Sequence, residues 1–435
     1  MKDKLSILLV NPPIYDFAAY DFWLKPLGML TAAGKIANAD FQLFDFLDRV
    51  HSFYSGKPKF KNDKWGRGSF YSEIITKPDV FKNVPRKFCR FGLPKDFFIE
   101  FLKENDHCDY VFVQTVMTYW YLGYKEVIET VKTYWPKAKI VLGGPYTKIC
   151  PEHAKSIGAD FIDGEENNPV MVPARGIEMM TRLNGVSLWN LYKNPETAAM
   201  KITQGCPFKC TYCTVPIFNK GFTARPYEEI IEEFNFIISL GVKNIAFYDD
   251  ALLYKADEVI KPFLRYVINN KIKINFHTPN ALNARFIDAE LADLLVRAGF
   301  KSFYLGFESR ADEFQKQTGA KIFDNEFSDA VKNLVAAGAG KSSITAYLIL
   351  GHPKFEIQNV EDSMKYVNSL GVRSMLADFS PIPIVADSKL CEKYVDISEP
   401  LMHNKTVFPI IVYGADKVNR IKDICRSLNH KVEGA

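Results

Sequence analysis

Three of the eight cysteines in this 435-residue chain fall within eight residues, as Cys206, Cys210 and Cys213 in the stretch CPFKCTYC. Thiols gathered this closely are typical of a metal centre. Gly205 and Pro207 oppose continuation of the stretch as a regular helix or strand, which indicates a loop. A structural zinc site closes with four protein ligands, and no other cysteine has a partner at zinc-ribbon spacing. A zinc site with a distant fourth ligand stays open as one alternative.

A cubane 4Fe–4S cluster is the other interpretation, because three cysteines can ligate three of its four irons. The fourth iron would then be open to a small molecule, just as catalytic metals keep one position for substrate. Three thiols leave a structural zinc ion one ligand short, whereas in a 4Fe–4S cluster they leave one iron free to bind a small molecule. The spacing therefore favours an iron–sulfur centre with one open iron.

The elements that must position this loop are strands that alternate with helices. Several of the helical patterns end on a glycine, the usual C-terminal cap. A full eight-unit barrel needs about 250 residues, and only about 185 are available here, so six units fit better. The loop follows the first strand, at the end of the barrel where chemistry is placed. The predicted strands are 199–205, 243–249, 273–278, 301–308, 342–351 and 373–380, and the helices 226–241, 256–270, 288–299, 325–338 and 358–371.

The spacing Cys206-x-x-x-Cys210-x-x-Cys213, with Tyr212 before the last cysteine and a six-unit barrel around it, resembles the signature of the radical S-adenosylmethionine (SAM) superfamily. The resemblance implies that the three cysteines ligate a 4Fe–4S cluster whose open iron chelates the methionine part of SAM. It also implies reductive cleavage of the sulfonium to a 5′-deoxyadenosyl radical, with Tyr212 beside the adenine.

Three acidic residues, at the ends of two strands, agree with that family pattern. Asp249 and Asp250 follow the second barrel strand, where an acid accepts a hydrogen bond from the methionine ammonium. The alternative is a helix N-cap pair. Glu308, in YLGFES, stands where the family places a glutamate near the SAM ribose, and the alternative is an ion-paired strand end.

The end of the fifth strand, YLILGHP, both follows the family and departs from it. Gly351 would permit the backbone to approach the adenine closely. His352 stands where the family usually has an apolar residue, and Lys354 where glycine is common. His352 is a candidate proton donor, with a surface-loop histidine as the alternative.

The N-terminal part predicts a flavodoxin-like, doubly wound parallel sheet. Such sheets bind ligands at the carboxyl ends of their strands, here Asn11–Pro13, Gln114–Thr118 and Gly143–Thr147. Residues 50–95 lack a period and are interpreted as a lid or insertion. The predicted strands are 4–10, 40–46, 109–115, 138–144 and 159–166, and the helices 26–37, 123–135 and 151–158.

The phrases LLVNPP, PLGML and VLGGPYTKICPEHAKSIGADFIDGEE, in this order before the cysteines, resemble the class of radical SAM enzymes with an N-terminal cobalamin-binding domain. The chain has no Asp-x-His-x-x-Gly motif, and the resemblance implies that cobalt needs no protein histidine. A degenerate domain that binds no cobalamin is the alternative. The candidate cobalamin contacts are Asn11, Pro12, Thr115, Thr118, Gly143 and Gly144.

The combined prediction is a cobalamin-type domain at 1–165, a linker at 166–198, a radical SAM (β/α)6 barrel at 199–385 and a small C-terminal subdomain at 386–435. The resemblance implies methylation of an unactivated carbon or phosphorus of a small molecule, with flavodoxin or ferredoxin as electron donor. Radical rearrangement, cyclisation or sulfur insertion is the alternative, and a non-catalytic zinc or iron–sulfur scaffold is a second one.

Composition narrows the setting of this chemistry. The net charge of +4 gives no nucleic-acid signal on a chain of this length. No apolar run approaches the roughly 18 residues of a membrane span. The initial LSILLV is too short for a secretory segment, so we expect a cytoplasmic protein with reduced thiols.

Overall fold

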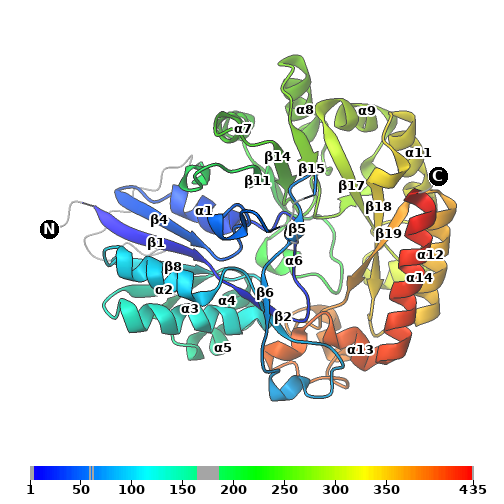
Figure 1. Cartoon of the computed structure of the whole chain (residues 1–435). Coiled ribbons are helices and arrows are strands. Elements are labelled where there is room, and N and C mark those ends of the chain that lie inside the picture. The colour runs from blue at the N-terminus through cyan, green and yellow to red at the C-terminus, as the bar shows by residue number, and fades with distance from the viewer. Residues whose placement is uncertain (1–3, 58–59, 61–62, 164–185, 434–435) are drawn as a thin grey trace. The chain divides into compact units, whose positions relative to one another are not determined.

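The computed structural model describes residues 4–57, 60, 63–163 and 186–433 (Figure 1). The chain divides into two compact units. The first consists of residues 1–196, 236–242 and 399–404, and the second of residues 197–235, 243–398 and 405–435. The predicted C-terminal subdomain is thus shared between the two units. The part of the predicted linker at 166–185 and the last residues of the predicted strand 159–166 lie outside the described residues.

A five-stranded parallel sheet forms the centre of the first unit, in the order β10-β9-β8-β1-β4. When the five strands are numbered 1 to 5 in chain order, the sheet reads 2-1-3-4-5 from β4 to β10. This is the order of flavodoxin-like folds, with the topological switch between β1 and β8. The predicted fold class of this part is confirmed. The strands are β1 (Leu5–Asn11), β4 (Ala39–Asp45), β8 (Tyr110–Gln114), β9 (Lys139–Gly143) and β10 (Phe161–Ile162).

One hydrophobic core of this unit lies on the sheet face that alternate strand residues such as Leu8, Val10 and Val111 share. Phe98 of α2 and Val127 of α3 belong to the same buried cluster. Helix α2 was not predicted, because it begins at the end of the aperiodic insertion. The helices are α1 (Leu27–Gly34), α2 (Lys95–Glu104), α3 (Tyr121–Tyr134), α4 (Pro145–Ile149) and α5 (Pro151–Ser156).

The insertion at 50–95 contains short strands, and β7 (Cys89–Phe91) lies between β2 (Ile14–Asp16) and β6 (Ser72–Ile74) in an antiparallel sheet. Arg90 of β7 donates to both carboxylate oxygens of Glu126 on α3, at 2.8 and 2.7 Å. This buried bidentate pair fixes the insertion to the first unit. A lid role for the insertion stays a prediction.

The second unit contains a sheet whose six main strands follow one another in sequence order, all parallel, with short β16 (Leu282–Asn283) paired to β17. Sequential order is that of a barrel wall, and the two outer strands do not pair with each other among the described residues, so the barrel is partial. This confirms the predicted fold class. The main strands are β11 (Thr197–Met200), β14 (Asn244–Phe247), β15 (Asn275–His277), β17 (Phe300–Glu308), β18 (Ile344–Leu350) and β19 (Arg373–Asp378).

Helices lie along this sheet, and α14, the last one, packs against both α12 and β19 (Figure 1). Local signals set the helix ends: the Asp288 carboxylate caps α9 by accepting from Leu291 N, and Gly299 ends it in the left-handed conformation. None of the described helices is both long and apolar enough to cross a membrane. The helices are α7 (Tyr227–Ser239), α8 (Ile260–Asn269), α9 (Ala289–Ala298), α10 (Asp312–Thr318), α11 (Asp324–Ala336), α12 (Ile357–Ser369), α13 (Val407–Tyr413) and α14 (Ala415–Glu433).

Candidate active site

The three clustered cysteines lie in a loop, residues 206–221, here called the cysteine loop. It connects β12 (Thr203–Gly205) to β13 (Phe222–Ala224), which pair antiparallel. The single strand predicted at 199–205 is therefore two strands, β11 and β12. Gly205 has φ +78°, and a Cβ there would lie 1.9 Å from the Gly221 carbonyl oxygen. The base of the loop can close only because residue 205 has no side chain.

The three thiols are free and half-buried. Burial raises the pKa of each, and raises that of Cys210 to about 11. No three His, Cys, Asp or Glu side chains in the described part of the chain surround a point that one metal ion would occupy. Thiolates on one tetrahedral zinc would lie about 3.8 Å apart. In a cubane each thiolate binds a different iron, so a set of three thiols with no fourth partner fits that group.

A half-buried cation beside the thiols was missed by the sequence analysis. Lys321 Nζ lies 3.3 Å from Glu308 Oε1, and its positive charge lowers the pKa of Cys206, Cys210 and Cys213. Burial is the largest single effect and lowers the pKa of Lys321, but the charges of Glu308, Cys210 and Cys206 and the hydrogen bond to Glu308 together outweigh it, so the net pKa is raised and the amine stays charged. Lys321 belongs to no recognisable motif, and only the fold brings it to the cysteines.

Glu308 ends β17 in a strained conformation, with φ +61°, at a register shift between Gly306 and Glu308. A Cβ on Gly306 would lie 3.0 Å from Lys321 Nζ and 3.2 Å from Glu308 Oε1. The glycine of the GFE run therefore leaves room for the Glu308–Lys321 pair. The ion-paired strand end foreseen as the alternative is present, and contact with the ribose stays a prediction.

Asp249 and Asp250 both hold the backbone that leads into the cysteine loop. Asp249 Oδ1 accepts from Ile202 N at 2.9 Å and from Thr203 N and Oγ1 at 2.5 and 2.7 Å. Asp250 accepts from Lys201 Nζ at 2.8 Å and from Gly205 N at 3.3 Å.

One oxygen of this acidic pair is buried without a partner in the described structure. Asp249 Oδ2 is buried and has no hydrogen-bond partner among the described residues. Burial raises the Asp249 pKa to about 6, against the hydrogen bonds from Thr203. The helix N-cap alternative is wrong, because Val259 is the N-cap of α8. Of the two acids, Asp249 is the one with a buried acceptor that no donor among the described residues occupies.

The end of β18 differs from expectation at two positions. Gly351 has φ +103°, and a Cβ there would lie 2.6 Å from Pro409 Cγ of α13, which is a packing reason for glycine. His352 is fully buried, and its Nε2 lies 3.1 Å from Asp387 Oδ2, so the surface-loop alternative for His352 is wrong. Burial lowers the His352 pKa against the charge of Asp387.

Tyr212 is close to two of these residues. Its ring stands edge-on to His352 at 6.0 Å between centroids, and, besides burial, the charge of the neighbouring Cys210 is one of the causes that raise its pKa. Burial raises the Tyr212 pKa well above its usual value, so the hydroxyl keeps its proton. Its contact with adenine stays a prediction.

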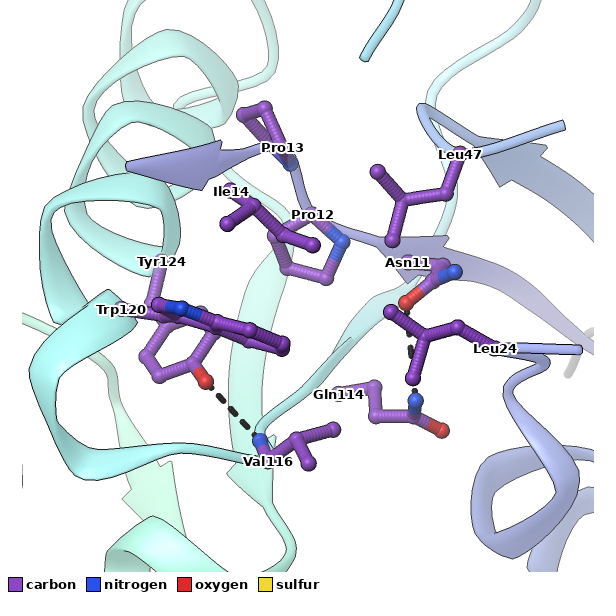
Figure 2. A pocket seen from close by; sticks show the side chains of 10 residues that line it. All are labelled: Asn11, Pro12, Pro13, Ile14, Leu24, Leu47, Gln114, Val116, Trp120 and Tyr124. Atoms are coloured by element: carbon purple, nitrogen blue, oxygen red, sulfur yellow. Dashed lines mark hydrogen bonds between the residues drawn. The ribbon is translucent and has the colours of Figure 1, made fainter. Parts of the chain in front are cut away.

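The first unit has a small pocket at its topological switch point, lined from the ends of β1 and β8 (Figure 2). Its volume is about 10 Å³, the room that one water molecule needs. Asn11 Nδ2 donates to Asp45 at 2.7 Å, and Gln114 Nε2 lies 3.5 Å from Asn11 Oδ1. Gln114 Oε1 is buried and has no partner among the described residues. The pocket lining includes Pro12, Pro13, Leu24, Trp120 and Tyr124.

The other residues predicted at this edge are occupied by protein contacts. Thr115 Oγ1 donates to the Gly143 carbonyl at 3.0 Å, and Thr118 Oγ1 lies 2.8 Å from His403 Nδ1. Gly144 has φ +122°, and a Cβ there would lie 2.2 Å from the Thr115 carbonyl oxygen. Gly144 thus makes room for the neighbouring strand end, and the cobalamin contacts stay predictions.

Comparison with known sequences identifies the second unit. Residues 200–367 match the profile described as the Radical SAM superfamily, a range that holds the cysteine loop, Asp249, Glu308 and Lys321. Residues 200–367 are therefore a radical SAM domain. The superfamily predicted from the cysteine spacing is confirmed for this domain.

Curated relatives match shorter segments. The ribosomal protein uS12 methylthiotransferase RimO of Bacteroides fragilis is 38% identical over 64 residues, 15% of each chain. The RimO of Carboxydothermus hydrogenoformans is 28% identical over 132 residues, 28% of this chain and 30% of the relative. The tRNA-2-methylthio-N(6)-dimethylallyladenosine synthase of Bdellovibrio bacteriovorus is 20% identical over 210 residues, 46% and 45% of the two chains. The chain thus spans less than half the length of these relatives.

Two solved structures share the fold across both units of this chain. The radical SAM methyltransferase TsrM from Kitasatospora setae, with cobalamin and a 4Fe–4S cluster bound, has a TM-score of 0.64 at 13% identity and covers 90% of this chain and 78% of its own. The cobalamin-dependent SAM radical enzyme OxsB, with aqua-cobalamin and SAM bound, has a TM-score of 0.52 at 11% identity and covers 96% and 56%. At these identities the likeness is one of fold.

Proposed function

We propose that this radical SAM enzyme cleaves SAM reductively at a 4Fe–4S cluster ligated by Cys206, Cys210 and Cys213. The observation that carries the proposal is a set of three free thiols beside the half-buried cation of Lys321, with no fourth ligand that completes a one-metal site among the described residues. When bound, the cluster supplies the electron that breaks the sulfonium and the open iron that chelates the methionine group. Lys321 offsets the negative charge that three thiolates bring to a half-buried loop.

The neighbouring side chains provide polar groups of the kind that SAM requires. Asp249 Oδ2 is a buried acceptor without a protein partner and suits the methionine ammonium. Glu308, whose Oε1 lies 3.3 Å from Lys321 Nζ, suits the ribose hydroxyls. The ring of Tyr212, which stands edge-on to His352, suits contact with adenine.

The first unit is proposed to bind cobalamin at the carboxyl ends of β1 and β8. A flavodoxin-like sheet binds ligands at this switch point. Gln114 Oε1, buried there without a partner, suits the amide groups that cobalamin carries. Asn11 holds the Gln114 side chain, and Pro12 lines the same edge (Figure 2). TsrM and OxsB, which share the fold, hold cobalamin.

The proposed reaction is methylation of an unactivated carbon or phosphorus of a small molecule. When bound, cobalamin supplies the methyl group, and flavodoxin or ferredoxin is the proposed electron donor. We place this reaction in the cytoplasm, where thiols stay reduced.

Sulfur insertion is the second candidate, because the curated relatives are methylthiotransferases. A second, sulfur-donating cluster would need a second group of thiols. The remaining cysteines do not form one in the described structure. They are Cys89, Cys108, Cys150, Cys391 and Cys425. This difference favours methylation over methylthiolation.

Cobalamin binding is testable without knowledge of the substrate. The chain, freed of cofactors and titrated with hydroxocobalamin, should acquire a corrinoid absorption band that remains after gel filtration. Gln114→Leu should weaken binding about tenfold, since it removes the buried acceptor. Gln317→Leu on the exposed side of α10 is the control and should bind normally. No retained corrinoid in the parent chain would contradict the cobalamin proposal and leave cluster chemistry standing.

A further inference from the structure

A buried polar cluster joins the C-terminal segment to the cysteine loop within the second unit. Its centre is Asp387, 3% exposed, in a short 3-10 helix at Ala386–Leu390. The Asp387 carboxylate accepts from Thr211 Oγ1, from His352 Nε2 at 3.1 Å and from Lys354 Nζ at 2.9 Å. Its backbone N–H donates to the Thr211 carbonyl at 3.1 Å. Asp387 thus holds Thr211 by both side chain and main chain.

The same carboxylate reaches Tyr212 through His352. His352 Nδ1 accepts from Lys354 N at 3.2 Å, so the ring proton lies on Nε2 and is donated to Asp387. Both ring nitrogens are satisfied, and the ring also stands edge-on to Phe379 at 4.7 Å. A ring fixed in this way presents a fixed surface to Tyr212.

Thr211 and Tyr212 are the two residues between Cys210 and Cys213. The turn between the two cysteines is closed by Cys213 N, which donates to the Cys210 carbonyl at 3.1 Å. Cys206 lies outside this turn. Fixing Thr211 and Tyr212 therefore fixes the separation and direction of two thiols and leaves the third to other contacts.

The charges around Asp387 make this attachment strong. Burial raises the pKa of Asp387, but the hydrogen bonds from Thr211 and Lys354 lower it below its usual value, so the carboxylate is ionised. Hydrogen bonds to an ionised acceptor are about twice as strong as neutral ones. A carboxylate buried here without these donors would be costly, so the segment and the loop are held together as one arrangement.

We propose that Asp387 is a positioning residue that holds Cys210 and Cys213 in the geometry needed to bind the cluster. The inference rests on the proposed cluster site and extends it to the C-terminal segment. Asp387 touches neither the thiols nor a ligand, and acts through Thr211 and through the His352 ring.

The first test uses the metal-free full-length chain, so that it does not depend on the cluster. Thiols are alkylated with iodoacetamide under anaerobic conditions, and the rate at each cysteine is followed by peptide mass spectrometry. Asp387→Asn and Thr211→Val should each accelerate alkylation of Cys210 and Cys213 by about tenfold, the factor that corresponds to about 1.4 kcal/mol of opening free energy. Cys206 is the internal reference and should change little. Asp396→Asn, an exposed change in the same segment, is the control variant.

The second test reads the cluster itself. After reconstitution, Asp387→Asn and Thr211→Val should lose at least half of the bound iron or show an altered electron paramagnetic resonance spectrum, while Asp396→Asn should match the parent. The double variant should be no worse than the stronger single variant, because both changes break one link. Equal acceleration at all three cysteines, or none, would overturn the positioning role. Faster alkylation of Cys210 and Cys213 in a chain that never binds iron would keep the positioning role and refute the cluster.

Discussion

Lys321 Nζ lies 3.3 Å from Glu308 Oε1, and the exposed fractions of the two side chains are only 19% and 11%. The pair joins the strained end of β17 to the segment that follows α10, and it stands beside three thiols. Breaking a buried ion pair from one side leaves a charge without compensation, whereas removing both partners does not.

We predict a strong non-additivity for this pair. Glu308→Gln and Lys321→Met should each lower the unfolding midpoint of the metal-free chain by about 4–8 °C, which corresponds to about 2 kcal/mol in a unit of this size. The double variant should recover at least half of that loss. Differential scanning calorimetry of all four chains measures the cycle, and additive losses would show that the pair does not act as a unit.

Lys321 should also tune the cluster. Lys321→Met removes a positive charge beside the thiolates, so the reduced, more negative cluster becomes less favourable and its midpoint potential should fall by a few tens of mV. Lys332→Met on an exposed helix position is the matched control. Redox titration followed by electron paramagnetic resonance measures both. An unchanged potential in Lys321→Met would place the amine outside the electrostatic reach of the cluster.

Asp249 should make stability depend on pH. Its folded pKa, about 6, lies above the usual value of 3.8, so the native state holds a proton that the unfolded chain releases. Its contribution to stability is full below about pH 4 and is lost as pH rises through 6. In Asp249→Asn the side chain does not titrate, so this pH-dependent loss of stability is absent. Relative to the parent, it should gain up to about 3 kcal/mol between pH 4 and pH 7, which urea unfolding at both values tests. If the difference in unfolding free energy between Asp249→Asn and the parent were the same at both pH values, the raised pKa would be contradicted.

Substitutions at Gly351 and Gly338 distinguish the cost of backbone strain from the cost of a steric clash. Gly351 and Gly338 have similar φ values, +103° and +99°, but a Cβ on Gly351 would meet Pro409 at 2.6 Å, whereas one on Gly338 would have no atom within 4 Å. Gly338→Ala should cost about 1 kcal/mol from strain alone. Gly351→Ala should cost about 1–3 kcal/mol more, because Pro409 must move. Equal losses in urea unfolding would mean that the contact with α13 is loose.

The sequence predicted correctly those features that depend on a short motif or on a regular pattern of apolar residues. The Cys206–Cys213 spacing indicated the superfamily, and buried strands such as β1 and β18 were placed to within two residues. Both sheet orders agree with the alternation of strands and helices. These features depend on local pattern, which a single sequence carries.

The features of the site that the sequence did not predict depend on contacts between residues that are distant in the chain. Lys321 reaches the thiols only because α10 returns to the ends of the strands, and nothing beside Lys321 in sequence marks it. His352 looked like a loop histidine because its partner, Asp387, lies 35 residues further along the chain. Gly351 was expected to let the backbone approach the adenine, which stays a prediction, and the place of its missing side chain is occupied by Pro409, 58 residues further along the chain.

The central claim is that Cys206, Cys210 and Cys213 alone hold a cluster with one open iron. The most direct measurement is anaerobic reconstitution of the parent chain and of Cys213→Ala, with iron and sulfide analysis and chromatography of 5′-deoxyadenosine after reduction with dithionite in the presence of SAM. The parent should bind about four irons and four sulfides and release 5′-deoxyadenosine, and the variant should release none. A Cys213→Ala chain that keeps a full cluster and still cleaves SAM would contradict the claim.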